Sequence, residues 1–316
     1  MVAALAFVIS FGLFHAGGFN AIYDNAKSLP GYLELMRTHN IMTNAADNYS
    51  SITIFSLLSW GLGYFGMTHI LVHFMAIKDT NKLKISRRVG TSWVVISMVL
   101  AIFIGIKGNA LSKNGTIKCL DGTNSETLVV QLANYMGKSG LLFAIVAGLI
   151  CSGILASTMS TVNAQLLVTS LAISEDIFKK VFGVNISKKK SAMLAKRTLL
   201  TIAAVCVTLA RNDSSSIYRI VSFAWGGFGA TFGPAMLVAL FWKRSSRQGV
   251  IASVFSDGIM VFVWKFGISR LGGIFAIYEL LPAFLCAAIT LILVSLITYS
   301  PDIEIENSFD SVQSEL

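Results

Sequence analysis

The chain has 316 residues, of which 54% are hydrophobic and 13% are charged, and its mean hydropathy is +0.70. Soluble domains carry about a quarter of charged residues, so this composition excludes a water-soluble enzyme and a nucleic-acid-binding protein. It indicates an integral membrane protein. The formal net charge of +9 at pH 7 is interpreted as an orientation signal, because membrane proteins gather Lys and Arg in their cytoplasmic loops. The four cysteines show no metal-binding or disulfide spacing.

Eight apolar stretches approach the length of about 20 residues that crosses about 30 Å of hydrocarbon. Each is predicted as a helix, because an open strand in lipid leaves backbone groups unpaired and barrel strands alternate apolar and polar residues. The predicted fold class is therefore an all-α, polytopic membrane protein of about eight transmembrane helices. These stretches are residues 2–22, 52–77, 89–111, 140–173, 197–211, 216–242, 249–268 and 278–299.

Three loops between these stretches hold most of the basic residues, and they fall on one side of the membrane if the eight helices are threaded in order. They are residues 78–88, 174–197 and 243–248. The positive-inside rule places that side in the cytoplasm. Both termini are then expected to be cytoplasmic, in a multi-pass protein of the inner (plasma) membrane. The acidic segment 300–316 is expected to be a solvated tail without a packing role.

The second stretch contains three glycines within six residues, Gly61, Gly63 and Gly66. Each glycine weakens a helix by about 1 kcal/mol relative to alanine. A break here frees backbone groups that can bind a solute or an ion, as in the midplane sites of secondary transporters. The alternative is that the glycines only allow two helices to approach closely.

The fourth stretch carries hydroxyl side chains at helical spacing. Ser157, Ser160 and Thr161 lie on one face of the predicted helix because they follow an i, i+3, i+4 pattern. Alkali cations prefer oxygen ligands without full charge, and hydroxyls with carbonyls of an unwound neighbour provide them. The alternative use is hydrogen bonding between helices, which contributes about 0.6 kcal/mol on average in membranes.

Other polar groups in apolar stretches have several interpretations. Asp257 lies inside the seventh stretch and is either a proton or cation site or the result of drift. Lys265 is expected to extend to the lipid headgroups. His69 and His73 have the i, i+4 spacing of a metal pair, but no third ligand is visible. No catalytic motif is present, so no enzyme activity is expected.

Several long segments of the chain resemble the sodium:solute symporter family, in particular its proline-transporting branch. They are SWGLGYFGMTHILVHFMA, GILASTMSTVNAQLLVTSLAISEDIF and VSFAWGGFGATFGPAMLVALFWKR. The resemblance implies a partial leucine-transporter-type inverted-repeat fold and sodium-coupled symport of proline or a similar small organic solute. Sodium would be the coupling ion, with no other cofactor, and the solute, sodium and membrane lipid would be the partners.

The resemblance also implies roles for individual residues. Ser160 and Thr161 match a hydroxyl pair that binds sodium, and Ser157 matches a backbone carbonyl ligand. Trp60 and Tyr64 match aromatic positions of the solute pocket. This chain departs from the family at Met67-Thr68, which puts proline specificity in question. The predicted solute-binding residues are Trp60, Gly63, Tyr64 and Thr68.

The family pattern begins about five helices earlier than this chain does. Residues 1–23 would be the last helix of the first repeat, 24–51 an external loop, 52–242 the five-helix second repeat and 243–299 two additional helices. Because the first broken helix would be absent, the chain alone is expected not to transport. It would need a missing N-terminal half encoded upstream. The alternative is a non-transporting remnant or one half of a split gene.

Overall fold

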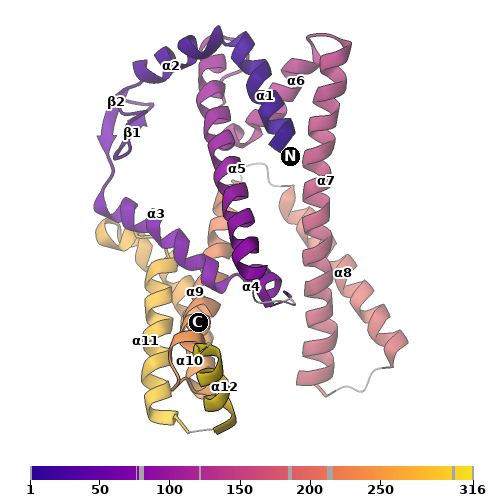
Figure 1. Cartoon of the computed structure of the whole chain (residues 1–316), viewed down its shortest axis with the longest axis vertical. Helices are drawn as coiled ribbons and strands as arrows, with labels where there is room; N and C mark the ends of the chain where they lie inside the picture. Colours follow the sequence, from indigo (N-terminus) through magenta and orange to yellow (C-terminus); the bar gives the residue numbers. More distant parts are fainter. Residues whose placement is uncertain are drawn as a thin grey trace. The chain divides into compact units, whose positions relative to one another are not determined.

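A computed structural model describes residues 2–75, 77, 82–120, 122–183, 187–211, 216–300 and 303–314. The chain forms two compact units, one of Met1–Ser28 with Ser92–Ser216 and one of Leu29–Thr91 with Ile217–Leu316. The division falls within helix α5 (Lys82–Lys113), which contributes residues to both. Figure 1 labels the helices and strands along the chain.

The first unit is helical, and its long helices are apolar. Its α-helices besides α5 are α1 (Val2–His15), α2 (Gly18–Ser28), α6 (Leu128–Gly137), α7 (Leu141–Leu171) and α8 (Lys188–Ala210). A 3₁₀ turn at Gly122–Thr127 precedes α6, and a π-helical segment at Ala172–Val181 follows α7. The long fourth stretch of the sequence is thus one helix that continues past its apolar part.

The first predicted span, residues 2–22, is wrong as one continuous helix. Helices α1 and α2 meet at a bend of 86°, which is visible in Figure 1. Gly17 and Gly18 have φ angles of +86° and +89° at this bend. Only glycine adopts this left-handed region without steric cost, so the two adjacent glycines end α1 and redirect the chain.

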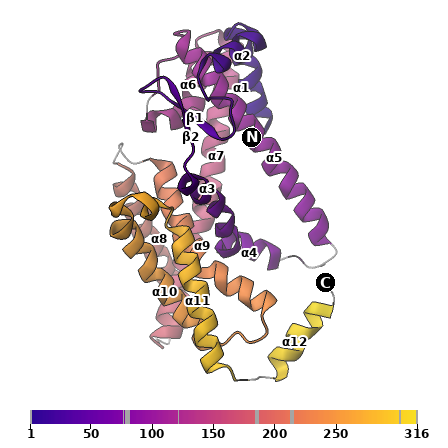
Figure 2. The same cartoon turned by 90° about the vertical axis from the view of Figure 1, so that its left-hand side faces the viewer.

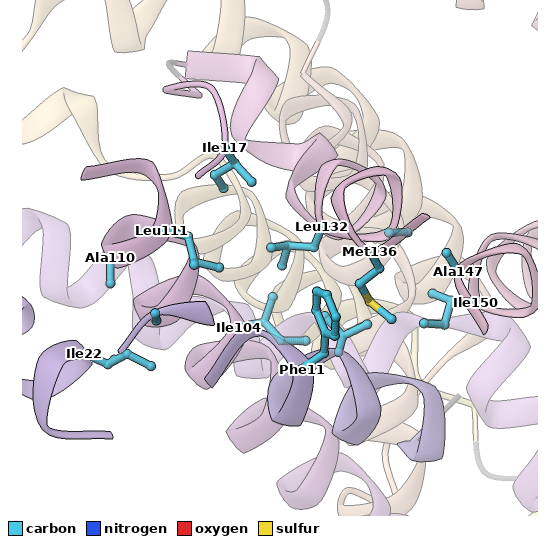
Figure 3. Close-up of a cluster of buried hydrophobic side chains, with 13 residues drawn as sticks. Phe11, Ile22, Ile104, Ala110, Leu111, Ile117, Leu132, Met136, Ala147 and Ile150 are labelled. Carbon is cyan, nitrogen blue, oxygen red and sulfur yellow. The ribbon is translucent and has the colours of Figure 1, made fainter. Parts of the chain in front are cut away.

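The core of the first unit lies where α1, α5, α6 and α7 meet. Figure 3 shows Phe11, Ile104, Met136 and Ile150, one from each of these helices, among its buried apolar side chains. Lys107 of α5 is also buried, and its Nζ donates a hydrogen bond to the Val8 carbonyl of α1. The described helices of this unit therefore pack through apolar contacts that also enclose the Lys107 side chain.

The second unit contains the remaining helices and the two strands. The strands β1 (Arg37–Asn40) and β2 (Ala45–Asn48) pair antiparallel, with Arg37 opposite Asn48. Residues 24–51 were predicted to be a loop, but they contain this hairpin and the end of α2. The helices are α3 (Ser51–Gly63), α4 (Thr68–Met75), α9 (Ile217–Phe241), α10 (Arg247–Phe266), α11 (Leu280–Thr298) and α12 (Ile303–Ser314). Short 3₁₀ turns occur at Tyr64–Gly66, Ile268–Leu271 and Gly273–Ala276.

Helices α9, α10 and α11 lie side by side in Figures 1 and 2 and form the core of the second unit. Ala230, Val261 and Phe284, one from each helix, are buried together. Hydroxyl groups also join α10 to α11. Ser253 donates a 3.0 Å hydrogen bond to the Ala287 carbonyl, and Ser295 accepts a 3.1 Å bond from the Ser246 amide.

The acidic tail does not match the prediction of a solvated end without packing. Residues 303–314 form helix α12, and Lys243 after α9 contacts two of its carboxylates, at 2.7 Å from Asp310 and 3.6 Å from Glu306. The hydrogen bond that Lys243 donates to Asp310 raises the pKa of Lys243. Figure 2 shows α12 after the end of α11. Asp302 and Glu315 lie outside the described residues.

Six continuous helices of the described residues are long and apolar enough to cross a membrane, and the bent α1–α2 pair makes up to seven. The all-α, polytopic membrane class is thus confirmed, apart from the small hairpin. The second predicted span, 52–77, is not continuous either, and its apolar helix ends early. At most a third of any long span is buried in the protein, which leaves apolar side chains to face lipid.

Of the basic loops, residues 184–186 and Lys78 lie outside the described residues, and Lys84 already belongs to α5.

Gly249 of α10 provides a test of the α10–α11 contact. A Cβ at this position would meet the Ser295 hydroxyl and would lie 2.9 Å from the Leu291 carbonyl oxygen, whereas a Cβ at Gly258 meets nothing within 4 Å. Overpacking costs about 1–3 kcal/mol. We expect Gly249→Ala to lower the thermal unfolding temperature in detergent micelles. Gly258→Ala in the same helix is the matched control and should keep or raise it. Equal shifts for the two variants would contradict this packing.

Candidate functional site

The apolar segment 51–75 is broken at the position that the glycines predicted. Helix α3 ends at Gly63, a 3₁₀ turn covers Tyr64–Gly66, and Met67 is extended with φ −77° and ψ 100° before α4 begins. The prediction of a break in this segment is confirmed. At Met67 the regular helical hydrogen-bond pattern stops, so backbone groups near the break need other partners.

Helix α9 supplies such a partner and packs directly on the break. The indole Nε1 of Trp225 donates a 3.1 Å hydrogen bond to the Trp60 carbonyl. A Cβ at Gly63 would overlap the Trp225 indole, and a Cβ at Gly66 would overlap the carbonyls of Phe228 and Gly229. Both interpretations of these glycines therefore apply. The segment is broken, and Gly63 and Gly66 also allow α9 to approach closely.

A cavity of about 190 Å³ lies in the second unit against α3, where its lining residue Trp60 is one turn before the break. This volume is below the about 300–1,000 Å³ of sites for drug-sized ligands, so it suits a small solute. Its lining combines aromatic rings, hydroxyls and two cationic side chains. The lining residues are Ser56, Leu57, Trp60, Tyr218, Arg219, Ser222, Lys265 and Tyr278.

The aromatic part of the cavity is built around the indole of Trp60. The rings of Tyr218, Trp225 and Tyr278 lie nearly parallel to it, with centroids 5.8, 5.6 and 6.0 Å away. Such ring faces carry negative partial charge and attract cations as well as apolar groups. This part of the cavity can therefore hold an apolar ring or an ammonium group.

Hydrogen bonds fix the position of Tyr278 between the helices. Its hydroxyl donates to the Ser222 carbonyl at 2.5 Å, and its amide donates to the Ser56 hydroxyl at 3.0 Å. Burial raises the pKa of Tyr278, and the charge of Glu279 raises it further. The phenol therefore remains protonated at neutral pH and keeps its hydrogen bond to α9.

The charged part of the cavity consists of Arg219 at the start of α9 and Lys265 near the end of α10. Lys265 was expected to extend to lipid headgroups, but its Nζ lies 2.9 Å from Oε1 of Glu279. The Glu279 side chain is 5% exposed, so its charge is desolvated and needs this cation. With Arg219 nearby, the three charged groups have a net charge of one positive unit, which favours an anionic group of a solute.

The four predicted solute-binding residues lie in different surroundings. Trp60 lines the cavity, and Gly63 is buried against α9. Tyr64 is 54% exposed with its ring edge-on to Trp225, and Thr68 is exposed at the start of α4. Sequence reasoning missed the lining residues from α9 and the segment before α11. No local motif marks them, since they adjoin Trp60 only after the chain has folded.

The hydroxyl face of α7 belongs to the first unit. Thr161 Oγ1 donates a 3.2 Å hydrogen bond to the Ser157 carbonyl, and Ser157, Ser160 and Thr161 are all exposed on an unbroken helix. The predicted spacing on one helical face is confirmed, whereas sodium binding there stays a prediction. The side chains of His69 and His73 lie outside the described part of the chain.

A broken apolar helix near a cavity, in a protein with several membrane-spanning helices, is a feature of secondary transporters. The comparison with protein families agrees with this class. The model of the sodium:solute symporter family matches residues 1–256. The chain belongs to this family.

Curated relatives include transporters from two bacteria. The chain is 34% identical to the high-affinity proline transporter PutP of Bacillus subtilis, over 100% of this chain and 62% of the relative. It is 34% identical to the osmoregulated proline transporter OpuE of the same species, over 95% and 57%. A sodium/proline symporter of Staphylococcus aureus is 34% identical, over 99% and 59%. The chain thus spans about three fifths of the length of these relatives, which are transporters and not enzymes.

Replacing Trp225 tests how the break is stabilised. We expect Trp225→Phe to leave the part-buried Trp60 carbonyl without its donor and so to destabilise the chain by less than the about 1–3 kcal/mol of a fully buried group. Thermal unfolding in detergent measures this loss. Trp93→Phe is the control, because Trp93 is 52% exposed in α5. If the two substitutions destabilise the chain equally, the indole donor does not hold the break.

Proposed function

We propose that this chain forms part of a sodium-coupled symporter for proline or a similar small zwitterionic solute. The observation that carries the proposal is the broken helix α3–α4 beside a cavity lined by aromatic and cationic side chains, in a member of the sodium:solute symporter family. The curated relatives, which are proline transporters, support the choice of solute.

The cavity has the chemistry to hold both ends of such a solute. Arg219 and Lys265 would bind the carboxylate, because a guanidinium forms bidentate bonds to carboxylates and the ammonium adds a point charge. The ring face of Trp60 would hold the pyrrolidine ring and its cationic nitrogen through apolar and cation–π contacts. Gly63, Tyr64 and Thr68 would form the rest of the solute face when the broken helix moves.

Sodium would bind at the hydroxyl face of α7. Because the Thr161 hydroxyl donates its proton to the Ser157 carbonyl, the lone pairs of Oγ1 are available to a cation. The Ser160 hydroxyl and the Ser157 carbonyl would be further oxygen ligands. These neutral oxygens suit an alkali cation, and carbonyls of a second broken helix would complete the coordination.

We further propose that the basic loops face the cytoplasm, with both termini on that side. Within the family fold, 52–242 would be the second repeat, after a helix of the first repeat in 1–23. Alternating access needs one repeat to move against the other. A matching N-terminal half would therefore be the functional partner. If the chain is instead a non-transporting remnant, adding that half restores nothing.

Uptake into proteoliposomes tests this function. We expect sodium-dependent uptake of labelled proline when the chain is co-expressed with the N-terminal helices of a curated relative, and no uptake by the chain alone. Ser160→Ala and Thr161→Ala should each weaken sodium activation roughly tenfold or more, because a bond to a charged group contributes about 1.5–3 kcal/mol.

Thr169→Ala is the matched control for these sodium variants. Its hydroxyl donates to the Gln165 carbonyl at 2.8 Å on the same helix, about 12 Å along the axis from Thr161, so sodium activation should not change. Uptake that continues unchanged in potassium, or that does not respond to either variant, would refute the sodium site. Uptake by the chain alone would refute the need for a second half.

Arg219 provides a separate test of the solute cavity. We expect Arg219→Gln to weaken proline binding roughly tenfold or more, since a charge-assisted bond to the carboxylate is lost. Equilibrium binding of labelled proline to the co-expressed protein measures this. Arg270→Gln is the control, because Arg270 lies in the neighbouring 3₁₀ turn and does not line the cavity. Equal affinities of the two variants would exclude Arg219 as the carboxylate ligand.

A further inference from the structure

One acidic side chain lies in the middle of a membrane-spanning helix and takes no part in the solute or sodium sites. Asp257 is the eleventh of the twenty residues of α10 and has an exposed fraction of 0%. A charged carboxylate at the centre of a bilayer costs several kcal/mol unless it is paired or solvated. The surroundings of Asp257 therefore decide which form of this group the fold can hold.

Among the described residues, the one polar partner recorded for Asp257 is Thr231 of α9. Thr231 Oγ1 is hydrogen-bonded to Asp257 Oδ2 and also lies 2.7 Å from the Gly227 carbonyl oxygen one turn earlier. The other carboxyl oxygen, Oδ1, is buried and has no hydrogen-bond partner in the described part of the chain. The carboxyl is thus held between two helices by one hydroxyl.

The number of protons in this cluster distinguishes the two forms of Asp257. The Thr231 hydroxyl has one proton, and the Gly227 carbonyl can only accept. The Thr231–Gly227 and Thr231–Asp257 contacts can both be hydrogen bonds only when Thr231 donates to the Gly227 carbonyl and Asp257 donates to Thr231. That arrangement requires a proton on Oδ2. An ionised carboxylate would compete with the carbonyl for one proton and would leave a charged oxygen buried without a donor.

Charged groups on the surrounding elements are too far along the helices to stabilise an ionised Asp257. Lys265 is eight residues further along α10, about 12 Å away, and it pairs with Glu279. Arg247 is ten residues earlier, about 15 Å away. Arg219 is at the start of α9 and Arg270 in the 3₁₀ turn after α10, while α11 contributes Cys286 as its titratable group. None of these is recorded as an ion-pair partner of Asp257.

We propose that Asp257, Thr231 and the Gly227 carbonyl form a buried proton-binding site between α9 and α10, occupied by one proton at neutral pH. The proton comes from water and resides on Oδ2 of Asp257, which then donates to Thr231. The site is separate from the sodium and solute sites above. Loss of the proton would place an unpaired charge between α9 and α10, so the site links proton binding to the packing of these two helices.

Infrared difference spectroscopy tests the proposal on the purified chain in lipid vesicles at neutral pH. The parent minus Asp257→Asn difference should show the C=O stretching band of a protonated carboxylic acid, shifted to lower frequency in heavy water. Thr231→Val removes the partner but keeps the acid. Its spectrum should retain the band at a higher frequency, because the hydrogen bond is lost.

Ser253→Ala is the matched control, since Ser253 is buried on the same helix and donates to the Ala287 carbonyl. Its band should equal that of the parent chain. If Asp257→Asn does not fold, the shift caused by Thr231→Val still identifies the band. Absence of an acid band in the parent chain would overturn the proposal. Loss of the band when sodium replaces potassium at constant pH would also overturn it, since the site would then bind a metal cation.

Discussion

The contact between the broken segment after α3 and helix α9 is the constraint on which the second unit depends. A break in a membrane helix exposes backbone groups that lipid cannot satisfy. Here Gly63 and Gly66 bring the backbone against α9, and the Trp225 indole bonds the Trp60 carbonyl. Trp60 also lies face to face with Tyr218 and Tyr278, which line the cavity with it.

Ionisable side chains of the second unit are stabilised in two different ways. At the ends of the helices, charged groups meet charged groups, as in the contacts of Lys265 with Glu279 and of Lys243 with the carboxylates of α12. In the middle of α10, Asp257 meets a single hydroxyl. The first arrangement pairs the desolvated carboxylate of Glu279 with Lys265 beside the cavity. The second favours a neutral acid, because bilayer depth offers neither water nor a cation.

Glycine has three separate uses in this chain, and its sequence context alone does not distinguish them. Gly17 and Gly18 take left-handed φ angles and bend α1 into α2. Gly249 lets α10 pack on α11, where a Cβ would meet Ser295. Gly61 lies inside α3, where a Cβ would meet nothing within 4 Å, so it lowers helix propensity without a packing role. A side chain added at Gly17 or Gly18 would strain the backbone, whereas one added at Gly249 would collide with α11.

The amino-acid sequence by itself determined the membrane class, six of the spans, the break in 59–69 and the family, because these follow from apolar length, local helix propensity and long motifs. It also placed the hydroxyls of Ser157, Ser160 and Thr161 on one face, since helical periodicity is local. Only the tertiary structure decided which side chains meet across helices. The packing of α12, the partners of Trp60 and the bond between Asp257 and Thr231 all join residues from distant segments of the chain, and no local pattern encodes them.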